Sequence, residues 1–159
     1  MMIRALLICL LTCCACVSRA QVHFERDFRD STLRIDYVFA GTDSTQRIAV
    51  DELKSFAGWA GRRVNLDRVP LKGNGEIVMR DAQDGHVMYK HSFSTLFQEW
   101  QSSEEATRVP RSFENVFLLP FPRRNVQVTV SLFDNKGRTV CAMSHPVKVN
   151  DILIRSVQA

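Results

Sequence analysis

The sequence predicts a mainly β protein, namely an antiparallel β-sandwich of the jelly-roll or Ig-like kind with one short helix. Three observations support this fold class. Several segments alternate apolar and polar residues with a period of two, which is typical of half-buried strands. Asp, Asn and Gly residues separate these segments and favour tight turns. A single stretch in the middle of the chain has apolar residues at helical spacing.

The first half of the chain contains two predicted hairpins. Residues 33–39 alternate clearly, and a polar turn leads from them to a second strand over residues 46–53. Residues 76–81 and 86–93 form the second pair, joined by a turn that contains Asp-Gly. Between the hairpins, residues 58–61 read GWAG, and two glycines around an aromatic ring predict an ordered loop.

A short helix is predicted over residues 95–105. Ser92 or Ser94 is expected to cap its N-terminus. Pro110 prevents its continuation, because the residue before a proline avoids helical backbone angles. The apolar stripe of this helix consists of Leu96, Phe97 and Trp100.

Further strands are predicted in the second half of the chain, over residues 113–119, 126–132 and 138–144. Residues 126–132 show the clearest alternation of the whole sequence, and a DNKG turn joins them to the next strand. Pro120 and Pro122 must lie at a sheet edge or in a turn, because proline cannot donate a hydrogen bond to a neighbouring strand. A last strand is expected after Pro146, through Val147, Val149, Ile152 and Ile154.

Residues 1–20 predict a secretory signal peptide, with Arg4 in a charged n-region, an apolar stretch after it and small residues before Gln21. The apolar stretch is shorter than the roughly 20 residues that span a bilayer. We therefore expect a secreted or periplasmic protein. The alternative is a lipid anchor on Cys16, which would make a cell-surface lipoprotein and would be its link to a membrane. After cleavage Cys141 is the single cysteine, so no intramolecular disulfide is expected.

Residues 21–159 are expected to form one domain, because they show no repeat, low-complexity tract or flexible linker. Two of the 21 basic residues, Arg4 and Arg19, lie in the leader, so 19 basic residues face 17 acidic ones in the mature chain. These charges are interleaved, without the basic block that is typical of a nucleic-acid-binding surface. Nucleic acid is therefore not an expected partner.

The sequence contains no catalytic motif that we can place. A zinc peptidase uses H-E-x-x-H on a helix, which puts two imidazoles and a glutamate beside one metal ion. None of the four histidines is followed by Glu or has another histidine four residues later. Asp81 and Asp84 are interpreted as turn residues, not as calcium ligands. We predict no catalytic residue, no metal ligand and no cofactor, and hence a protein that is not an enzyme.

Binding residues are easier to suggest than catalytic ones. Trp59 and Trp100 can offer flat rings to a sugar or a partner chain, with Arg62 and Arg63 at the rim of such a site. Trp59 is the strongest candidate, because it stands between two glycines and next to the double arginine. The alternative is that these aromatic rings belong to the core or cap a sheet.

Several short segments, in the same order, resemble a known family. These segments are LRIDY (residues 33–37), GWAGRR (58–63), PLKGNG (70–75), LFQEWQ (96–101), FEN (113–115) and DILIR (151–155). Through them the chain is similar to the N-terminal, non-catalytic domain of the IgA peptidases, a bacterial secreted zinc-metallopeptidase family (peptidase family sixty-four). The resemblance extends over most of the mature chain.

This resemblance implies an accessory domain that packs against a peptidase catalytic domain, or positions a protein substrate for one. The catalytic domain itself is absent from the sequence, and no position matches the zinc or catalytic residues of the family. The alternative is a stand-alone surface adhesion or glycan-binding β-sandwich. A bare apolar patch would favour the accessory domain, whereas an aromatic groove in a charged surface would favour glycan binding.

Overall fold

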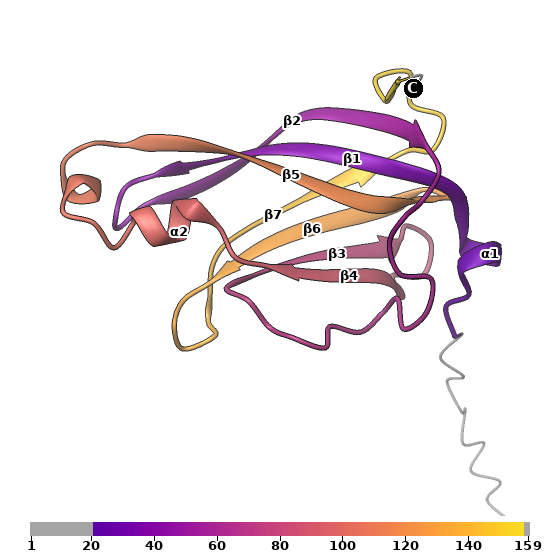
Figure 1. Ribbon diagram of the computed structural model, residues 1–159, viewed down its shortest axis with the longest axis horizontal. Helices are drawn as coiled ribbons and strands as arrows, with labels where there is room; N and C mark the ends of the chain where they lie inside the picture. The colour runs from indigo at the N-terminus through magenta and orange to yellow at the C-terminus, as the bar shows by residue number, and fades with distance from the viewer. Residues whose placement is uncertain (1–20, 158–159) are drawn as a thin grey trace, which may run out of the picture.

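The computed structural model describes residues 21–157, which form two stacked sheets of four strands each (Figure 1). The predicted β-sandwich is confirmed. The predicted cleavage site and Cys16 lie outside the described residues, so the signal peptide and the lipid anchor stay predictions. Within the described residues, no helix has the length and apolar character needed to cross a membrane.

The strands are divided between two sheets. Sheet A contains, in spatial order, β5 (Arg111–Pro122), β1 (Phe28–Gly41), β2 (Gln46–Ala57) and β8 (Arg155–Ser156). Sheet B contains β4 (Val87–Phe93), β3 (Gly75–Asp81), β6 (Val126–Phe133) and β7 (Thr139–Val147). All paired strands are antiparallel except β8, which runs parallel to β2. The three predicted hairpins, β1–β2, β3–β4 and β6–β7, are confirmed.

The core lies between the sheets and comes mainly from the two segments with the clearest alternation. β1 and β6 each place every second side chain in the interior, and these side chains are buried. Burying one large aliphatic or aromatic side chain contributes about 1.5–3 kcal/mol, so these strands hold the sandwich together. The buried residues are Leu33, Ile35, Tyr37 and Phe39 on β1, and Val126, Val128, Val130 and Leu132 on β6.

A β-bulge in β2 explains an irregular apolar pattern. Asp36 of β1 pairs with Glu52, but the next residue, Tyr37, pairs with Val50, so Asp51 is the extra residue. The extra residue reverses the facing of the strand, because successive side chains point to opposite sides. Val50 and Leu53 both pack against the core for this reason, although they are three residues apart.

The prolines of β5 lie where the sequence predicted them. β5 is an edge strand of sheet A, and Pro120 and Pro122 are its last residues, paired with Thr32 and Phe28 of β1. An edge strand has one side without a neighbouring strand, so missing N–H groups are tolerated there. β7 is likewise an edge strand, of sheet B, and contains Pro146.

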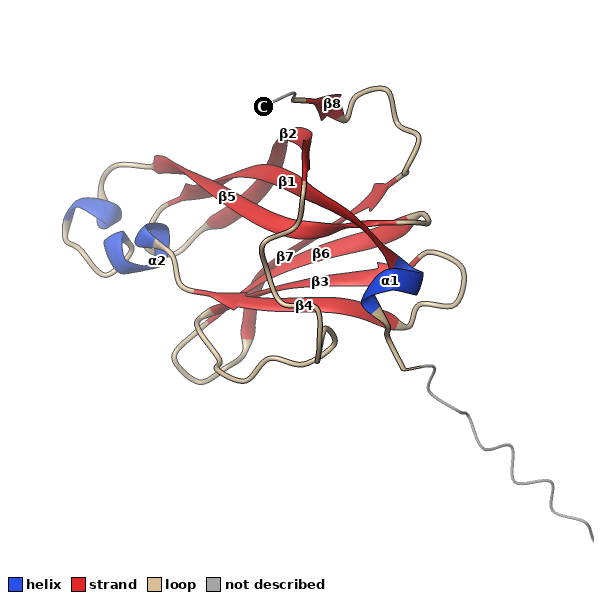
Figure 2. Ribbon diagram, turned by 45° about the vertical axis from the view of Figure 1, so that its right-hand side comes forward, coloured by secondary structure: helices blue, strands red, loops and turns tan. Residues whose placement is uncertain are grey.

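The helices are short and lie at opposite ends of the sandwich (Figure 2). α2 (Leu96–Trp100) is the predicted helix, but it ends five residues earlier than expected, and a 3-10 turn (Glu105–Thr107) follows. Thr95, not a serine, is its cap, and its hydroxyl accepts a hydrogen bond from the Gln98 amide at 3.1 Å. α1 (Phe24–Asp27) was not predicted, since four residues carry no helical periodicity.

The predicted last strand is wrong. Val147 still belongs to β7, and residues 148–154 cross from sheet B to sheet A without strand structure. Only Arg155 and Ser156 pair with β2, in the parallel direction. The reason is visible in the spacing, because the step from Val149 to Ile152 breaks the period of two that a strand requires.

Candidate functional site

The segment that joins β2 to β3, residues 58–74 (the linking segment), carries the strongest sequence candidate, Trp59. The Trp59 backbone amide donates to Asp30 Oδ1 at 3.0 Å, and its indole Nε1 donates to the Arg62 carbonyl at 3.0 Å. Its ring meets the Tyr89 ring edge-on, with centroids 6.1 Å apart. Only 8% of the residue is exposed. Trp59 is therefore a wall of the core with one edge at the surface, and not a flat stacking platform.

Gly61 is required by this arrangement. A Cβ atom at position 61 would lie 2.2 Å from a carbon of the Trp59 ring, far inside van der Waals contact. Only glycine allows the backbone to approach the indole so closely. The GWAGRR segment thus has a packing role that its two glycines already indicated.

Arg62 fastens the linking segment to the edge of β4. Its guanidinium donates to the carbonyls of Arg68 (2.5 Å), Leu66 (3.1 Å) and Lys90, and it lies over the Tyr89 ring, 4.9 Å from the centroid. Among the described residues, no carboxylate forms an ion pair with Arg62. Its positive charge is therefore not neutralised by a partner and disfavours a second positive charge nearby. Partial burial and this charge together lower the pKa of His91.

Arg63 and Trp100 lie elsewhere. Arg63 turns toward α1, where it pairs with Asp30 at 2.7 Å and covers the Phe24 ring at 4.3 Å. Trp100 lies on α2, packs against Phe97 and Phe113, and donates from Nε1 to Glu105 at 2.9 Å. Of the four predicted binding residues, the structure brings Trp59 and Arg62 into one site and places Arg63 beside it, whereas Trp100 is at the α2 end.

A groove of about 460 Å³ lies against Trp59, on the side of the sandwich where β4 and β5 are the edge strands. The linking segment forms one wall through Leu71, which is 82% exposed, and β5 contributes Leu118, which is 55% exposed. Tyr89 and Arg62 also line it. Sequence reasoning missed the two leucines, because they are 47 positions apart and meet only through the crossing of the linking segment. The signal in the sequence was Leu71, a large apolar residue in the otherwise turn-like segment PLKGNG.

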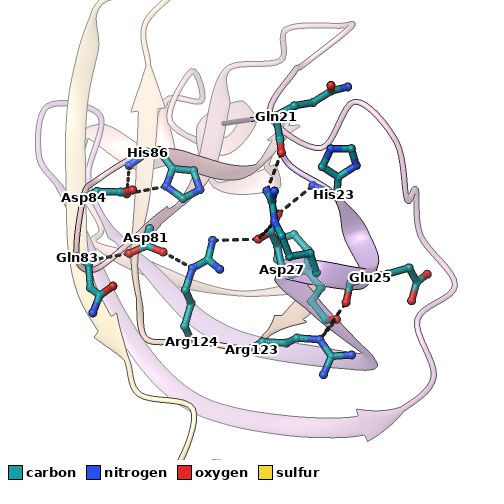
Figure 3. Close-up of polar contacts among 12 residues, drawn as sticks. Gln21, His23, Glu25, Asp27, Asp81, Gln83, Asp84, His86, Arg123 and Arg124 are labelled. Carbon is teal, nitrogen blue, oxygen red and sulfur yellow. Dashed lines mark hydrogen bonds and ion pairs between the residues drawn. The ribbon is translucent and has the colours of Figure 1, made fainter. Parts of the chain in front are cut away.

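A cluster of charged residues connects α1, β3 and the turn between β5 and β6 at the α1 end of the molecule (Figure 3). Arg124 lies between two buried carboxylates and donates to Asp27 at 3.0 Å and to Asp81. Burial by itself raises the pKa of Asp27, but hydrogen bonds from Arg26 and the His23 amide, with the charges of Arg26 and Arg124, outweigh it and lower that pKa. This cluster fixes the chain around α1 and is best explained as structural.

Asp81, Asp84 and His86 come close enough to suggest a cation site, since one ligand atom from each lies within 4.8 Å of the others. Their contacts explain the cluster without an ion. Asp81 already binds Arg124 and the Gln83 amide, while Asp84 Oδ1 accepts from both the amide and Nδ1 of His86 (Figure 3). These are the bonds of a turn between β3 and β4.

A comparison with known protein families matches residues 23–143 to the family described as Peptidase M64 N-terminus. The chain belongs to this family. The resemblance seen in the sequence is therefore confirmed. The match to the peptidase N-terminal family begins beside α1 and ends within β7, so it includes the linking segment, Trp59 and both walls of the groove. Among curated proteins, none matches this chain.

Membership of the peptidase N-terminal family indicates the kind of protein in which this site occurs, but it assigns no reaction to the site. The matched region corresponds to the N-terminal part of a peptidase, and no catalytic part is matched. The groove offers apolar walls and basic groups, which are binding features.

Proposed function

We propose that this chain is the non-catalytic accessory domain of a secreted IgA-type metallopeptidase, and that it packs against the catalytic domain of such a peptidase. The family match over residues 23–143 is the observation that carries this proposal. The sequence has no H-E-x-x-H motif. The zinc chemistry of the peptidase would then reside in the catalytic domain, while this domain supplies a surface.

The proposed docking surface is an adjacent pair of exposed aliphatic residues, Ile152 and Leu153, in the connection from β7 to β8. They are 94% and 78% exposed, although covering one such side chain contributes about 1.5–3 kcal/mol. Single exposed apolar side chains are common on protein surfaces, but two adjacent ones that are this exposed give a partner domain an apolar contact to cover. We therefore place the contact with the catalytic domain on this pair.

The position of the pair along the fold fits a domain that precedes another. β8 follows it directly, and the Val157 amide donates to the Ser55 carbonyl of β2 at 2.9 Å. Arg155 adds an ion pair with Glu52 of β2. In a peptidase whose catalytic domain comes next in the chain, that domain would begin beside the connection from β7 to β8 (Figure 2).

The experiment uses residues 21–159 and the separately produced catalytic domain of a peptidase of this family from the same genome. We expect a 1:1 complex in sedimentation velocity and a changed rate of peptide cleavage. Replacing Ile152→Asp and Leu153→Asp together should weaken the complex at least about tenfold, because two charges would enter an apolar contact.

The matched control is Leu96→Asp, which places the same charge on another highly exposed aliphatic residue, at the start of α2 and at the far end of the sandwich (Figure 1). This variant should bind like the unaltered chain. Absence of a complex, together with an unchanged cleavage rate, would refute the proposed function. Equal weakening by both variants would refute the docking surface.

A further inference from the structure

The two edge strands that border the Trp59 groove, β4 and β5, differ in how far another segment already covers their outer edge. The β4 edge is already covered by the linking segment: the Lys90 amide donates to the Leu66 carbonyl at 2.8 Å, and the Gly73 amide donates to Ser92 Oγ at 2.6 Å. Arg62 covers the Lys90 carbonyl as well. β4 is thus protected from pairing with another strand.

The β5 edge is open. Within residues 21–157, the backbone of residues 112–119 forms hydrogen bonds with β1 and with no other strand or loop, although the Phe113 carbonyl also accepts a hydrogen bond from Asn115 Nδ2 at 3.0 Å. Pro120 and Pro122 prevent ladder formation only at the end of the strand. An open edge of this length is a template for an added strand, because every second residue directs its N–H and C=O outward.

The groove beside this edge has a definite chemical character. Its walls are apolar, through Leu71 and Leu118, and its charged lining residues, Arg62 and Lys90, are both basic, although Lys90 Nζ also pairs with Glu76 at 3.7 Å. No carboxylate lines it among the described residues. A ligand that complements this surface carries an aliphatic group for the walls and a negative charge for the basic groups.

We propose that the Trp59 groove and the open edge of β5 bind an extended acidic peptide segment of another protein, which adds a strand to sheet A. One aliphatic side chain of the peptide lies between Leu71 and Leu118, and a neighbouring carboxylate faces Arg62 and Lys90. Alternating side chains of an added strand point to opposite faces, so a pattern of aliphatic and acidic residues in alternation fits the site. This inference does not depend on the docking of a catalytic domain.

The test uses residues 21–159 and an array of decapeptides in which leucine or valine alternates with glutamate. Titration followed by amide NMR should shift the signals of residues 112–119 and slow their hydrogen exchange. The Trp59 indole signal should move, because its ring borders the groove, while the Trp100 indole signal at the other end should stay unchanged. A second array, with lysine in place of glutamate, should not bind.

Two variants in the linking segment provide a matched comparison. Leu71→Glu removes an apolar wall and adds a repelling charge, and should weaken binding at least about tenfold. Val64→Glu makes the same change at a residue that is 72% exposed but does not line the groove, and should leave binding unchanged. Both side chains are solvent-exposed, so neither variant is expected to unfold the protein.

Three results would overturn the proposal. The first is an absence of shifts in β5 with every acidic peptide of the array. The second is equal binding of the acidic and the basic arrays, or equal weakening by Leu71→Glu and Val64→Glu. The third is protection of the β5 amides without peptide in a protein of doubled mass, which would make a second copy of this chain the occupant of the edge.

Discussion

Tyr37 and His145 join the two sheets through the interior of the sandwich. The Tyr37 hydroxyl on β1 donates to His145 Nε2 on β7 at 2.6 Å, and the rings meet edge-on with centroids 5.7 Å apart. His145 Nδ1 contacts the Pro146 carbonyl at 3.3 Å, so this tautomer carries its proton on Nδ1. Burial lowers the pKa of His145 and so favours the neutral imidazole.

Stability should fall below neutral pH because of this pair. Burial lowers the pKa of His145, and the Pro146 carbonyl offsets this only in part. The unfolded chain, with a histidine pKa near 6.5, then binds more protons than the folded chain, so stability is present above about pH 6.5 and decreases as pH falls through the folded pKa. Urea unfolding between pH 7.5 and 5 should show the decrease. His145→Gln should reduce the slope without abolishing it, because burial and Arg62 also lower the pKa of His91, and a slope unchanged in that variant would contradict the assignment.

Arg124 should be important for stability, because it separates and neutralises two buried carboxylates. Arg124→Ala leaves Asp27 and Asp81 without this partner and should lower the free energy of unfolding by about 3 kcal/mol. The exposed pair between Arg138 and Asp134 offers the control, since Arg138→Ala should cost less than about 1 kcal/mol. Denaturant unfolding at pH 7 measures both.

Acid should weaken the same cluster. The folded pKa of Asp27 is lowered, so its contribution is present above the unfolded pKa near 3.9 and is lost as pH falls through the folded value. An Asp27→Asn chain should consequently be less stable than the unaltered one at pH 7, and the difference should shrink below pH 4. A constant difference would show that charge is not the cause.

Gly61→Ala should disturb the Trp59 site directly. The added methyl group would overlap the indole and force the linking segment to move, at a cost of about 1–3 kcal/mol. The Trp59 indole NMR signal should shift with it. Ala60→Ser, at the exposed neighbouring residue, should leave both the signal and the stability unchanged.

The Cys141 thiol should react slowly with disulfide reagents. Partial burial raises its pKa, which reduces the thiolate fraction at neutral pH. Its reaction with a disulfide reagent at pH 7.5 should be slower than that of glutathione by about tenfold, and denaturation in urea should remove the difference. A fast reaction in the folded protein would contradict the proposed effect of burial.

The sequence predicted the parts of the fold that depend on local period. Residues 33–39 and 126–132 alternate because each lies in a sheet with one face on the core, and the two prolines of β5 indicated an edge. The predicted last strand is wrong because residues 148–154 cross from sheet B to sheet A, and Ile152 within this crossing is exposed to solvent. Alternation of apolar and polar residues identifies strands, and it does not identify a segment that crosses between two sheets.

The candidate site was predictable only in part. Trp59 and Arg62 are close in sequence and bond to each other locally, so one segment revealed both. Trp100 resembled them in residue type but lies at the other end of the sandwich, a distance that composition does not encode. Leu71 and Leu118 line the same groove because the linking segment passes the edge of β5, and this arrangement appears only in the tertiary structure.

The brevity of β8 has a mechanical consequence. Two paired residues, one additional backbone bond and the Arg155–Glu52 ion pair hold the C-terminal segment to β2, whereas β7 pairs with β6 along its length. Tension applied at Val157 should detach β8 first and release residues 148–157, about 30 Å of extended chain, before the load reaches β7. Residues 148–157 can thus extend under force while the core stays folded.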